Sequence, residues 1–225
     1  INAHPFSRRL RYNDDIYGLL REYTLKFGPA VQITGRWYIG AHFTNGFMAH
    51  LGLDFSWDRA FGIDSKRADG EVFPTSSRAW YVGGRYRLPW NGQMFSVGAG
   101  YGLHSFVVES AGPSQPGRQN IPLIPGSTYR YVGLGLEARF AAEAGFRATI
   151  RAGYRFLTSL GGLEQNIWFP RTTGGGIDAE VQLGWEFDEG LELRVGVDVR
   201  RYFFSMNPER LDDNVVGGAV DQYIG

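Results

Sequence analysis

The sequence contains no cysteine, so it has neither a disulfide framework nor a thiolate metal site. Its 23 basic and 23 acidic residues balance, and no charge excess points to nucleic acid or to an acidic partner. No apolar run approaches the ~20 residues that a membrane-spanning helix needs. These absences exclude a disulfide-stapled fold, a basic nucleic-acid-binding protein and a helical membrane protein.

Alternation of apolar and polar residues is the strongest signal that is present, and it is clearest between Tyr129 and Phe156. Every second residue is apolar in 132–140 and again in 146–156, and the residues between are mainly Arg, Glu, Thr and Gly. A period of two predicts β-strands, and the short link at 141–145 joins them into an antiparallel hairpin. Strands of ~10 residues with one apolar and one polar face are typical of a transmembrane β-barrel, although a soluble sheet with one wet face is the commoner source of this pattern.

The same alternation recurs along the chain and predicts ten strands. In the first of them Phe6, Leu10 and Tyr12 share the apolar face, which Arg8 interrupts, and in the second Tyr23 and Leu25 begin an outward face where Pro29 predicts a bulge. The facing of the last strand is not evident. The predicted strands are 4–12, 23–39, 46–58, 78–88, 93–108, 129–140, 146–156, 177–187, 191–203 and 217–225.

The predicted connections alternate in length. Links after even-numbered strands are short (40–45, 89–92, 141–145, 188–190), and links after odd-numbered strands are long (13–22, 59–77, 109–128, 158–176, 204–216). Membrane barrels have short periplasmic turns and long external loops, whereas a soluble sandwich has no reason to sort its loops in this way. The chain is therefore predicted to be all-β: one domain, residues 1–225, forming a ten-stranded antiparallel up-and-down transmembrane β-barrel.

Aromatic residues gather near the predicted strand ends, as the two interfacial girdles of a membrane barrel require. The girdle beside the short turns is predicted to contain Trp37, Phe47, Tyr86, Phe95, Phe140, Phe146 and Trp185. The girdle toward the long loops is predicted to contain Trp57, Trp80, Phe156 and Phe203, with Tyr23 beside them.

In this architecture the chain resembles the small outer-membrane β-barrel proteins of Gram-negative bacteria, of the OmpA and OmpX kind, here with ten strands. The resemblance implies a bacterial outer-membrane location, long loops outside, termini in the periplasm, and contact with the lipid bilayer and lipopolysaccharide. Such barrels usually end on a terminal aromatic, whereas this chain stops at Ile224-Gly225, so we expect the end of the last strand to be missing or more protein to follow. The start at Ile1 is expected to follow removal of a signal peptide.

The inward faces of strands two to nine carry a nearly balanced set of charges, nine basic and eight acidic. Ten strands enclose a narrow lumen, which groups of this size would largely fill. We therefore predict a structural network of ion pairs, and the main alternative is a polar pore lining for small solutes. The predicted network contains Arg36, Asp54, Arg85, Glu137, Arg139, Arg147, Arg151, Arg155, Glu180, Glu186, Arg194 and Asp198.

Candidate catalytic groups are few. His104 and Ser105 are adjacent on one strand, so they point to opposite faces and cannot form a catalytic pair. His50 shares the inward face with Asp54 and is interpreted as a hydrogen-bonded interior histidine. No cofactor site and no metal-ligand spacing is evident.

The sequence thus predicts a non-enzymatic outer-membrane barrel, closed by its salt-bridged lumen, that acts as a structural anchor or as an interaction component of an envelope complex through its loops or termini. A narrow porin for small polar solutes is the alternative. A soluble lipocalin-like carrier, whose apolar face would line a cavity, is the third possibility.

Overall fold

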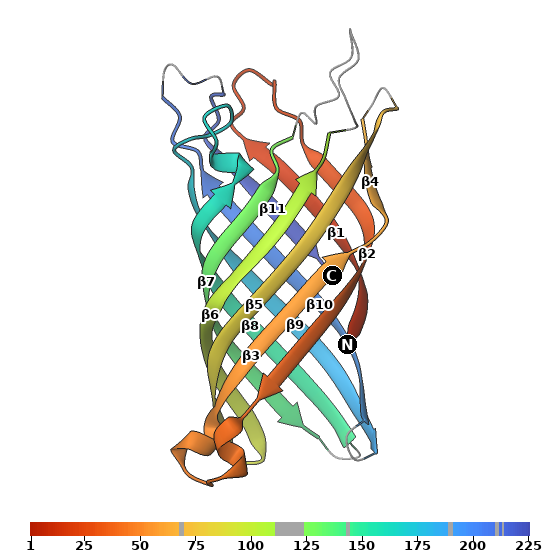
Figure 1. Ribbon diagram of the computed structural model, residues 1–225, viewed down its shortest axis with the longest axis vertical. Helices are drawn as coiled ribbons and strands as arrows, with labels where there is room; N and C mark the ends of the chain where they lie inside the picture. The colour runs from red at the N-terminus through yellow and green to blue at the C-terminus, as the bar shows by residue number, and fades with distance from the viewer. Residues whose placement is uncertain (68–69, 111–123, 143–144, 189–190, 210–211, 213) are drawn as a thin grey trace.

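The computed structural model describes residues 1–67, 70–110, 124–142, 145–188, 191–209, 212 and 214–225. Ten antiparallel strands form a closed ring, which confirms the predicted fold (Figure 1). The ring is completed by pairing of β3 with β5 and of β1 with β11. Its strands are β1 (Asn2–Asn13), β2 (Tyr23–Trp37), β3 (Leu51–Ala60), β5 (Val72–Trp90), β6 (Gln93–Val108), β7 (Ser127–Ala141), β8 (Phe146–Gly161), β9 (Thr173–Asp188), β10 (Leu191–Ser205) and β11 (Gly218–Ile224).

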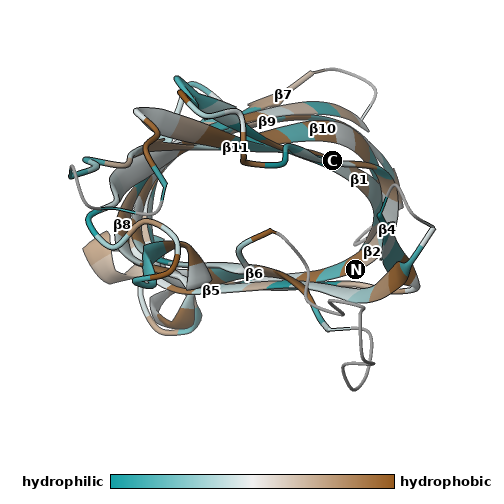
Figure 2. Ribbon diagram, turned by 90° about the horizontal axis from the view of Figure 1, so that it is seen from above, coloured by the Kyte–Doolittle hydropathy of each residue, from teal (hydrophilic) through white to brown (hydrophobic). Residues whose placement is uncertain are grey.

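The strands are strongly tilted in Figure 1, and the barrel is oval in Figure 2. A short additional strand, β4 (Ile63–Lys66), pairs with the start of β5 and extends this hairpin beyond the ring. The helical segments η1 (Ile39–His42), η2 (Phe47–His50) and η4 (Gly162–Glu164) are single 3-10 turns. None of the described helices is long or apolar enough to cross a membrane.

Large apolar side chains cover the outside of the barrel. Leu134 is 49% exposed, Leu183 65% and Val195 72%, and outward positions of β3 and β5–β10 continue this band around the wall. An exposed apolar surface of this extent marks contact with another molecule or with a membrane. Because the apolar faces point out of the barrel and not into a cavity, the carrier interpretation is wrong.

The first strand has the opposite facing to the one predicted. Phe6 and Leu10 are buried inside the barrel, Tyr12 packs against the same interior core, and Arg9 is exposed on the outer face. Tyr23, which pairs with Leu10, is also buried inside. These residues join the apolar cluster that fills the lumen on the side of the long loops, and apolar groups are stabilised by packing there.

The bulge of β2 lies before the predicted position. Phe6 pairs with Gly28 and Arg8 with Leu25, so two residues, Lys26 and Phe27, face the single residue between Phe6 and Arg8. This shift reverses the facing of the start of β2 and places Tyr23 and Leu25 inside, whereas Ile33 and Trp37, beyond the bulge, face outward as predicted. Pro29 itself stays in the ladder and pairs with Pro5.

The connection between β2 and β3 is longer than predicted. It runs over 38–50 through η1 and η2, so 46–50 is not part of a strand. Phe47 is still exposed at this rim. Ala49, which would share the outward face of Phe47 in the predicted strand 46–58, is buried. Parts of the predicted long links 59–77 and 158–176 form strands, because β5, β8 and β9 extend beyond the ranges predicted for them. The middle of the link 109–128 and residues of the links 141–145 and 188–190 lie outside the described residues.

The chain ends lie part-way along the barrel wall and not at the short-turn rim (Figure 1). β11 is short and orients Ala219, Asp221 and Tyr223 inward, where all three are buried. Toward the short turns, described pairings of 33–37 in β2 involve β3 alone, and those of 191–197 in β10 involve β9 alone.

Candidate functional site

The lumen is the part of the molecule where polar chemistry is concentrated. Three arginines of β8, Arg147, Arg151 and Arg155, are four residues apart and all point inward. A spacing of four in a strand separates neighbours by ~13 Å, so each arginine meets a different set of acids. Their acidic partners are Glu186 and Glu192 for Arg147, Glu137 and Glu180 for Arg151, and Asp178 for Arg155.

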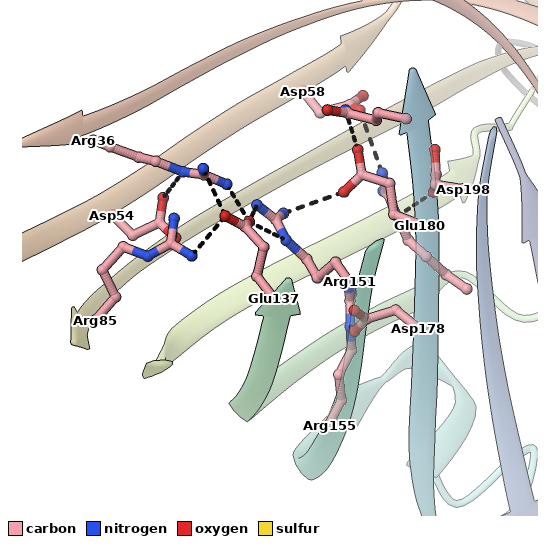
Figure 3. A network of polar contacts seen from close by, with 12 residues as sticks. Arg36, Asp54, Asp58, Arg85, Glu137, Arg151, Arg155, Asp178, Glu180 and Asp198 are labelled. Carbon is pink, nitrogen blue, oxygen red and sulfur yellow. Dashed lines mark hydrogen bonds and ion pairs between the residues drawn. The ribbon is translucent and has the colours of Figure 1, made fainter. Parts of the chain in front are cut away.

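Glu137 is the centre of the middle group, which Figure 3 shows. Its carboxylate accepts hydrogen bonds from Arg36 Nη1 at 2.9 Å and Arg151 Nη2 at 2.8 Å, and it lies 3.2 Å from Arg85 Nη2. Its side chain is only 5% exposed. Asp54 adds a second carboxylate, 3.6 Å from Arg85 Nη1. Three guanidinium groups and two carboxylates thus nearly neutralise one another in a confined space.

A second group lies nearer the short turns and centres on Glu192. Arg139 Nη2 donates to Glu192 at 2.6 Å and Arg194 Nη2 donates at 2.8 Å, while Arg147 Nη1 is 3.5 Å away. Arg147 also pairs with Glu186. These groups are partly hydrated, since the side chain of Arg194 is 45% exposed.

The most deeply buried ion pair lies toward the long loops, and the sequence analysis did not predict it. Arg8 binds Asp221 through two nitrogens, Nε at 2.9 Å and Nη2 at 2.7 Å, and both side chains are 0% exposed. Arg8 Nη2 also donates to Ser127 Oγ at 2.7 Å, and the hydroxyls of Tyr129 and Tyr223 donate to Asp221 at 2.6 and 3.1 Å. We call these five residues the Arg8 clasp.

The clasp was missed because Arg8 was interpreted as an interruption of an outward apolar face. The signal that could have found it is the same residue: a single arginine between Phe6 and Leu10 fits an inward face, as the inward arginines of β8 do. The strand 217–225 gave no clear facing, so Asp221 had no predicted place.

Aromatic rings pack around the clasp and fill the lumen at this level. Tyr129 lies 4.3 Å from Tyr202 between ring centroids, and His104 lies 4.3 Å from Tyr223. His104 is buried and its Nδ1 is 3.0 Å from the hydroxyl of Tyr202. Ser105 faces the other way and bonds Thr128 at 3.0 Å, so the two residues do not meet.

A small cavity of about 20 Å³, room for about one water molecule, lies between the clasp and the middle group. His4 and Asp58 line it and are joined by a 3.0 Å contact from Nε2 to Oδ2, and Arg200 of the same lining binds Asp198 at 2.9 Å. His50 lies instead in η2 beside the ring of Tyr86, and its buried Nδ1 has no hydrogen-bond partner among the described residues.

The structure places every residue of the predicted network in an ion pair within the lumen. Beyond these twelve, the ion pairs contain Asp58, Asp178, Glu192 and Arg200, which belong to the predicted inward charges but not to the predicted network, and Arg8, Asp221 and His4, which belong to neither. The predicted girdle residues lie on the outside, where Trp37, Phe47, Phe140, Phe146, Trp185, Trp57, Trp80, Phe156 and Phe203 are exposed and Tyr86 and Phe95 are partly buried. Tyr23 is the exception and points inward.

The long loops are tied together outside the barrel wall. Arg171, in the loop after β8, pairs with Asp212, in the loop after β10, and its Nε donates to the carbonyl of Asn207 at 3.2 Å. Asn207 Nδ2 returns a bond to the carbonyl of Arg171 at 3.1 Å. The hydrogen bond from Arg171, followed by one from the backbone N–H of Glu209, lowers the pKa of the Asp212 carboxyl.

This loop contact is expected to weaken in acid. Because the pKa of Asp212 is lower in the folded protein, its contribution to stability is present above the unfolded pKa of ~3.9 and is lost as the pH falls through the folded value. Hydrogen exchange of 162–172, corrected for the intrinsic rate, should be faster at pH 3 than at pH 5. In the Arg171→Gln variant, residues 162–172 should exchange fast at both pH values. In the Arg21→Gln variant, where the substitution lies in another loop, they should exchange as in the unmutated protein. Equal pH dependence in Arg171→Gln would contradict the assignment.

Among the described residues no group of three or more His, Asp or Glu is arranged to hold a metal ion. The sequence matches no protein-family model and no curated protein. Solved structures that it is similar to include outer membrane phospholipase A from Escherichia coli, with 10% identity, a TM-score of 0.36 and coverage of 100% of this chain and 95% of that chain. The Salmonella typhi outer membrane phospholipase dimer with bound calcium has 10% identity, a TM-score of 0.35 and coverage of 100% and 89%. At this identity the likeness concerns barrel architecture alone.

Proposed function

We propose that this chain is an integral outer-membrane barrel with a closed lumen, which acts as a structural anchor or as an interaction component of the cell envelope and is not an enzyme. The apolar exterior supports a position in the bilayer, since strands cross membranes only as closed barrels. The difference between its two rims favours long loops outside and short turns on the periplasmic side.

The observation that carries the closed state is that ionic bonds join opposite walls of the barrel. Arg36 of β2 binds Glu137 of β7, with β3, β5 and β6 between them in the ring. At the level of the clasp, Arg8 of β1 reaches Ser127, again on β7. A hydrated ion crossing the lumen would have to break such bonds and separate buried charges, which is costly.

One observation favours the narrow porin as a second candidate. Side-chain exposure in the lumen rises from 0% at Arg8 to 35% at Arg151 and 45% at Arg194. Water therefore reaches the lumen from the short-turn side, and the two candidates differ in whether the ionic contacts around Glu137 and Arg8 keep water and ions from passing through.

We expect the unmutated barrel to give little or no conductance in a planar bilayer. Glu137→Ala should conduct measurably, because it leaves Arg36, Arg85 and Arg151 without their shared carboxylate and their mutual repulsion spreads the lumen. Arg151→Gln should show a weaker leak and a lower melting temperature. Single-channel recording at matched protein insertion measures each variant.

Glu22→Gln is the matched control, since Glu22 is an exposed acid outside the strands whose ion pair, among the described residues, is with Arg11 at 3.7 Å. It should be as silent as the unmutated barrel. Stable, ion-selective steps from the unmutated protein would refute the closed anchor and favour the porin.

A further inference from the structure

Seven basic residues of the ring strands point outward from the barrel wall near the long loops, and each is exposed. Arg11 of β1 pairs with Glu22, and the other six, from six different strands, form no ion pair with a described residue. We call this set the basic collar: Arg9 of β1, Lys26 of β2, Arg59 of β3, Arg78 of β5, Arg130 of β7 and Arg201 of β10.

The collar borders the apolar band. Arg59 follows Trp57 at the next outward position, Arg78 precedes Trp80, and Arg130 precedes Val132. The opposite rim is different: outward positions there, such as Leu88 and Phe140, are apolar. Among residues whose side chains the structure describes, outward-facing Arg and Lys on the ring strands are confined to the long-loop side.

The distance from the collar to the apolar rim beside the short turns matches the thickness of one hydrocarbon core. Ten residues separate Arg130 from Phe140 on β7, and ten separate Arg78 from Leu88 on β5. Ten residues span ~33 Å along a strand, or ~25 Å along the barrel axis at a tilt of ~40°, which equals the apolar band of a membrane barrel. If the apolar rim lies at one interface, the collar lies at the headgroups of the other leaflet.

The collar has no anionic partner among the described residues. None of its six side chains forms an ion pair with another described residue, and the carboxylates described on the ring strands do not share its outer face. Arg59 and Arg78 stand directly opposite each other on paired strands. Two like charges in this position repel unless an anion lies between them.

We infer that the basic collar binds the phosphate groups of an anionic lipid in the leaflet on the long-loop side, with the Arg59–Arg78 pair as its strongest site. Guanidinium groups pair with phosphate through two hydrogen bonds, which suits Arg in five of the six positions. In an outer membrane this lipid is the phosphorylated lipid A portion of lipopolysaccharide. The inference rests on the membrane location proposed above.

The test uses the full barrel reconstituted in phosphatidylcholine nanodiscs with added diphosphorylated lipid A. Native mass spectrometry and titration measure the lipid bound to the unmutated protein and to Arg59→Gln/Arg78→Gln. The double variant should bind about 30-fold more weakly, the effect of removing two basic groups from an anionic membrane surface. Arg21→Gln, which removes an exposed loop arginine, should bind normally.

Two further binding measurements identify the ligand. Dephosphorylated lipid A should bind at least tenfold more weakly than the diphosphorylated form, and millimolar inorganic phosphate should not displace the lipid. Heat-modifiable gel migration establishes that each variant is folded. Equal binding by the double variant, or equal binding of dephosphorylated lipid A, would overturn the collar assignment. Failure of the unmutated barrel to insert into phosphatidylcholine without lipid A would overturn the proposed membrane location as well.

Discussion

Replacing Arg8 with methionine is expected to destabilise the barrel by roughly 3–5 kcal/mol, the cost of leaving a buried charge without its partner. Asp221 would retain only the hydroxyls of Tyr129 and Tyr223, at a site that is 0% exposed. The guanidinium also lies 4.1 Å from the ring centroid of Phe106, so a contact with the aromatic packing is lost too. Urea unfolding in detergent, followed by heat-modifiable gel migration, measures the loss.

The control is the double variant Arg8→Met/Asp221→Leu, which removes both charges. Replacing a whole buried ion pair with apolar groups is often neutral, so this variant should recover part of the stability. Recovery should be incomplete because the two tyrosine hydroxyls lose their acceptor. If Arg8→Met alone lowered the free energy of unfolding by less than ~1 kcal/mol, water would have to solvate Asp221, and the lumen would be open at this level.

Leu134→Arg is expected to cost roughly 2–4 kcal/mol, because it places a charge near the middle of the lipid-facing band. Leu134 is 49% exposed, and its partners on the two neighbouring strands, Ala99 and Tyr154, also face outward. Val195→Arg, on β10 and three strands away around the ring, should behave in the same way. Unfolding in lipid vesicles is the measurement, since a detergent belt adapts to a charge more readily than a bilayer does.

Thr149→Arg provides the comparison, because Thr149 lies on the inward face of β8. The new charge would stand opposite Arg139, and such a like-charge pair in a sheet costs less than ~1 kcal/mol. The lipid-facing substitution should therefore be clearly worse. Equal losses at the two sites would reverse the facing assigned to β7 and β8.

The facing of β3 and β5–β10 could be predicted from the sequence because one face of each strand meets lipid and the other meets the polar lumen. Where one face meets lipid and the other meets water, as at Leu134 and Glu137, alternation alone separates outside from inside. β1 lies beside the long loops, where the outer face meets polar surroundings. Phe6 and Leu10 then gain by packing inside, and an alternation rule that assumes lipid outside gives the reverse facing.

Most of the charged residues in the lumen could be predicted, although Arg8, Asp221 and His4 were not, and the pairing of these charges could not be predicted. Parity places Arg36 and Glu137 inside the barrel, yet they meet only because the tilt of the strands brings β2 and β7 to the same level across the lumen. The 3-10 turn at 47–50 escaped prediction for a different reason. Phe47, Ala49 and Leu51 continue the alternation of β3, and the turn is fixed by contacts such as the stacking of Phe47 on Tyr86.

The Arg8 clasp has a consequence for the order of assembly. Arg8 and Asp221 are 213 residues apart and belong to the first and last strands, so their contact closes nearly the whole chain into one loop. The chain entropy lost in such a closure is large compared with that of any neighbouring hairpin, which disfavours it as an early event. Until the first and last strands meet, both charges remain hydrated on the open edges of a curled sheet. The final step of folding therefore removes water from an arginine and an aspartate at the same moment that the cylinder becomes continuous.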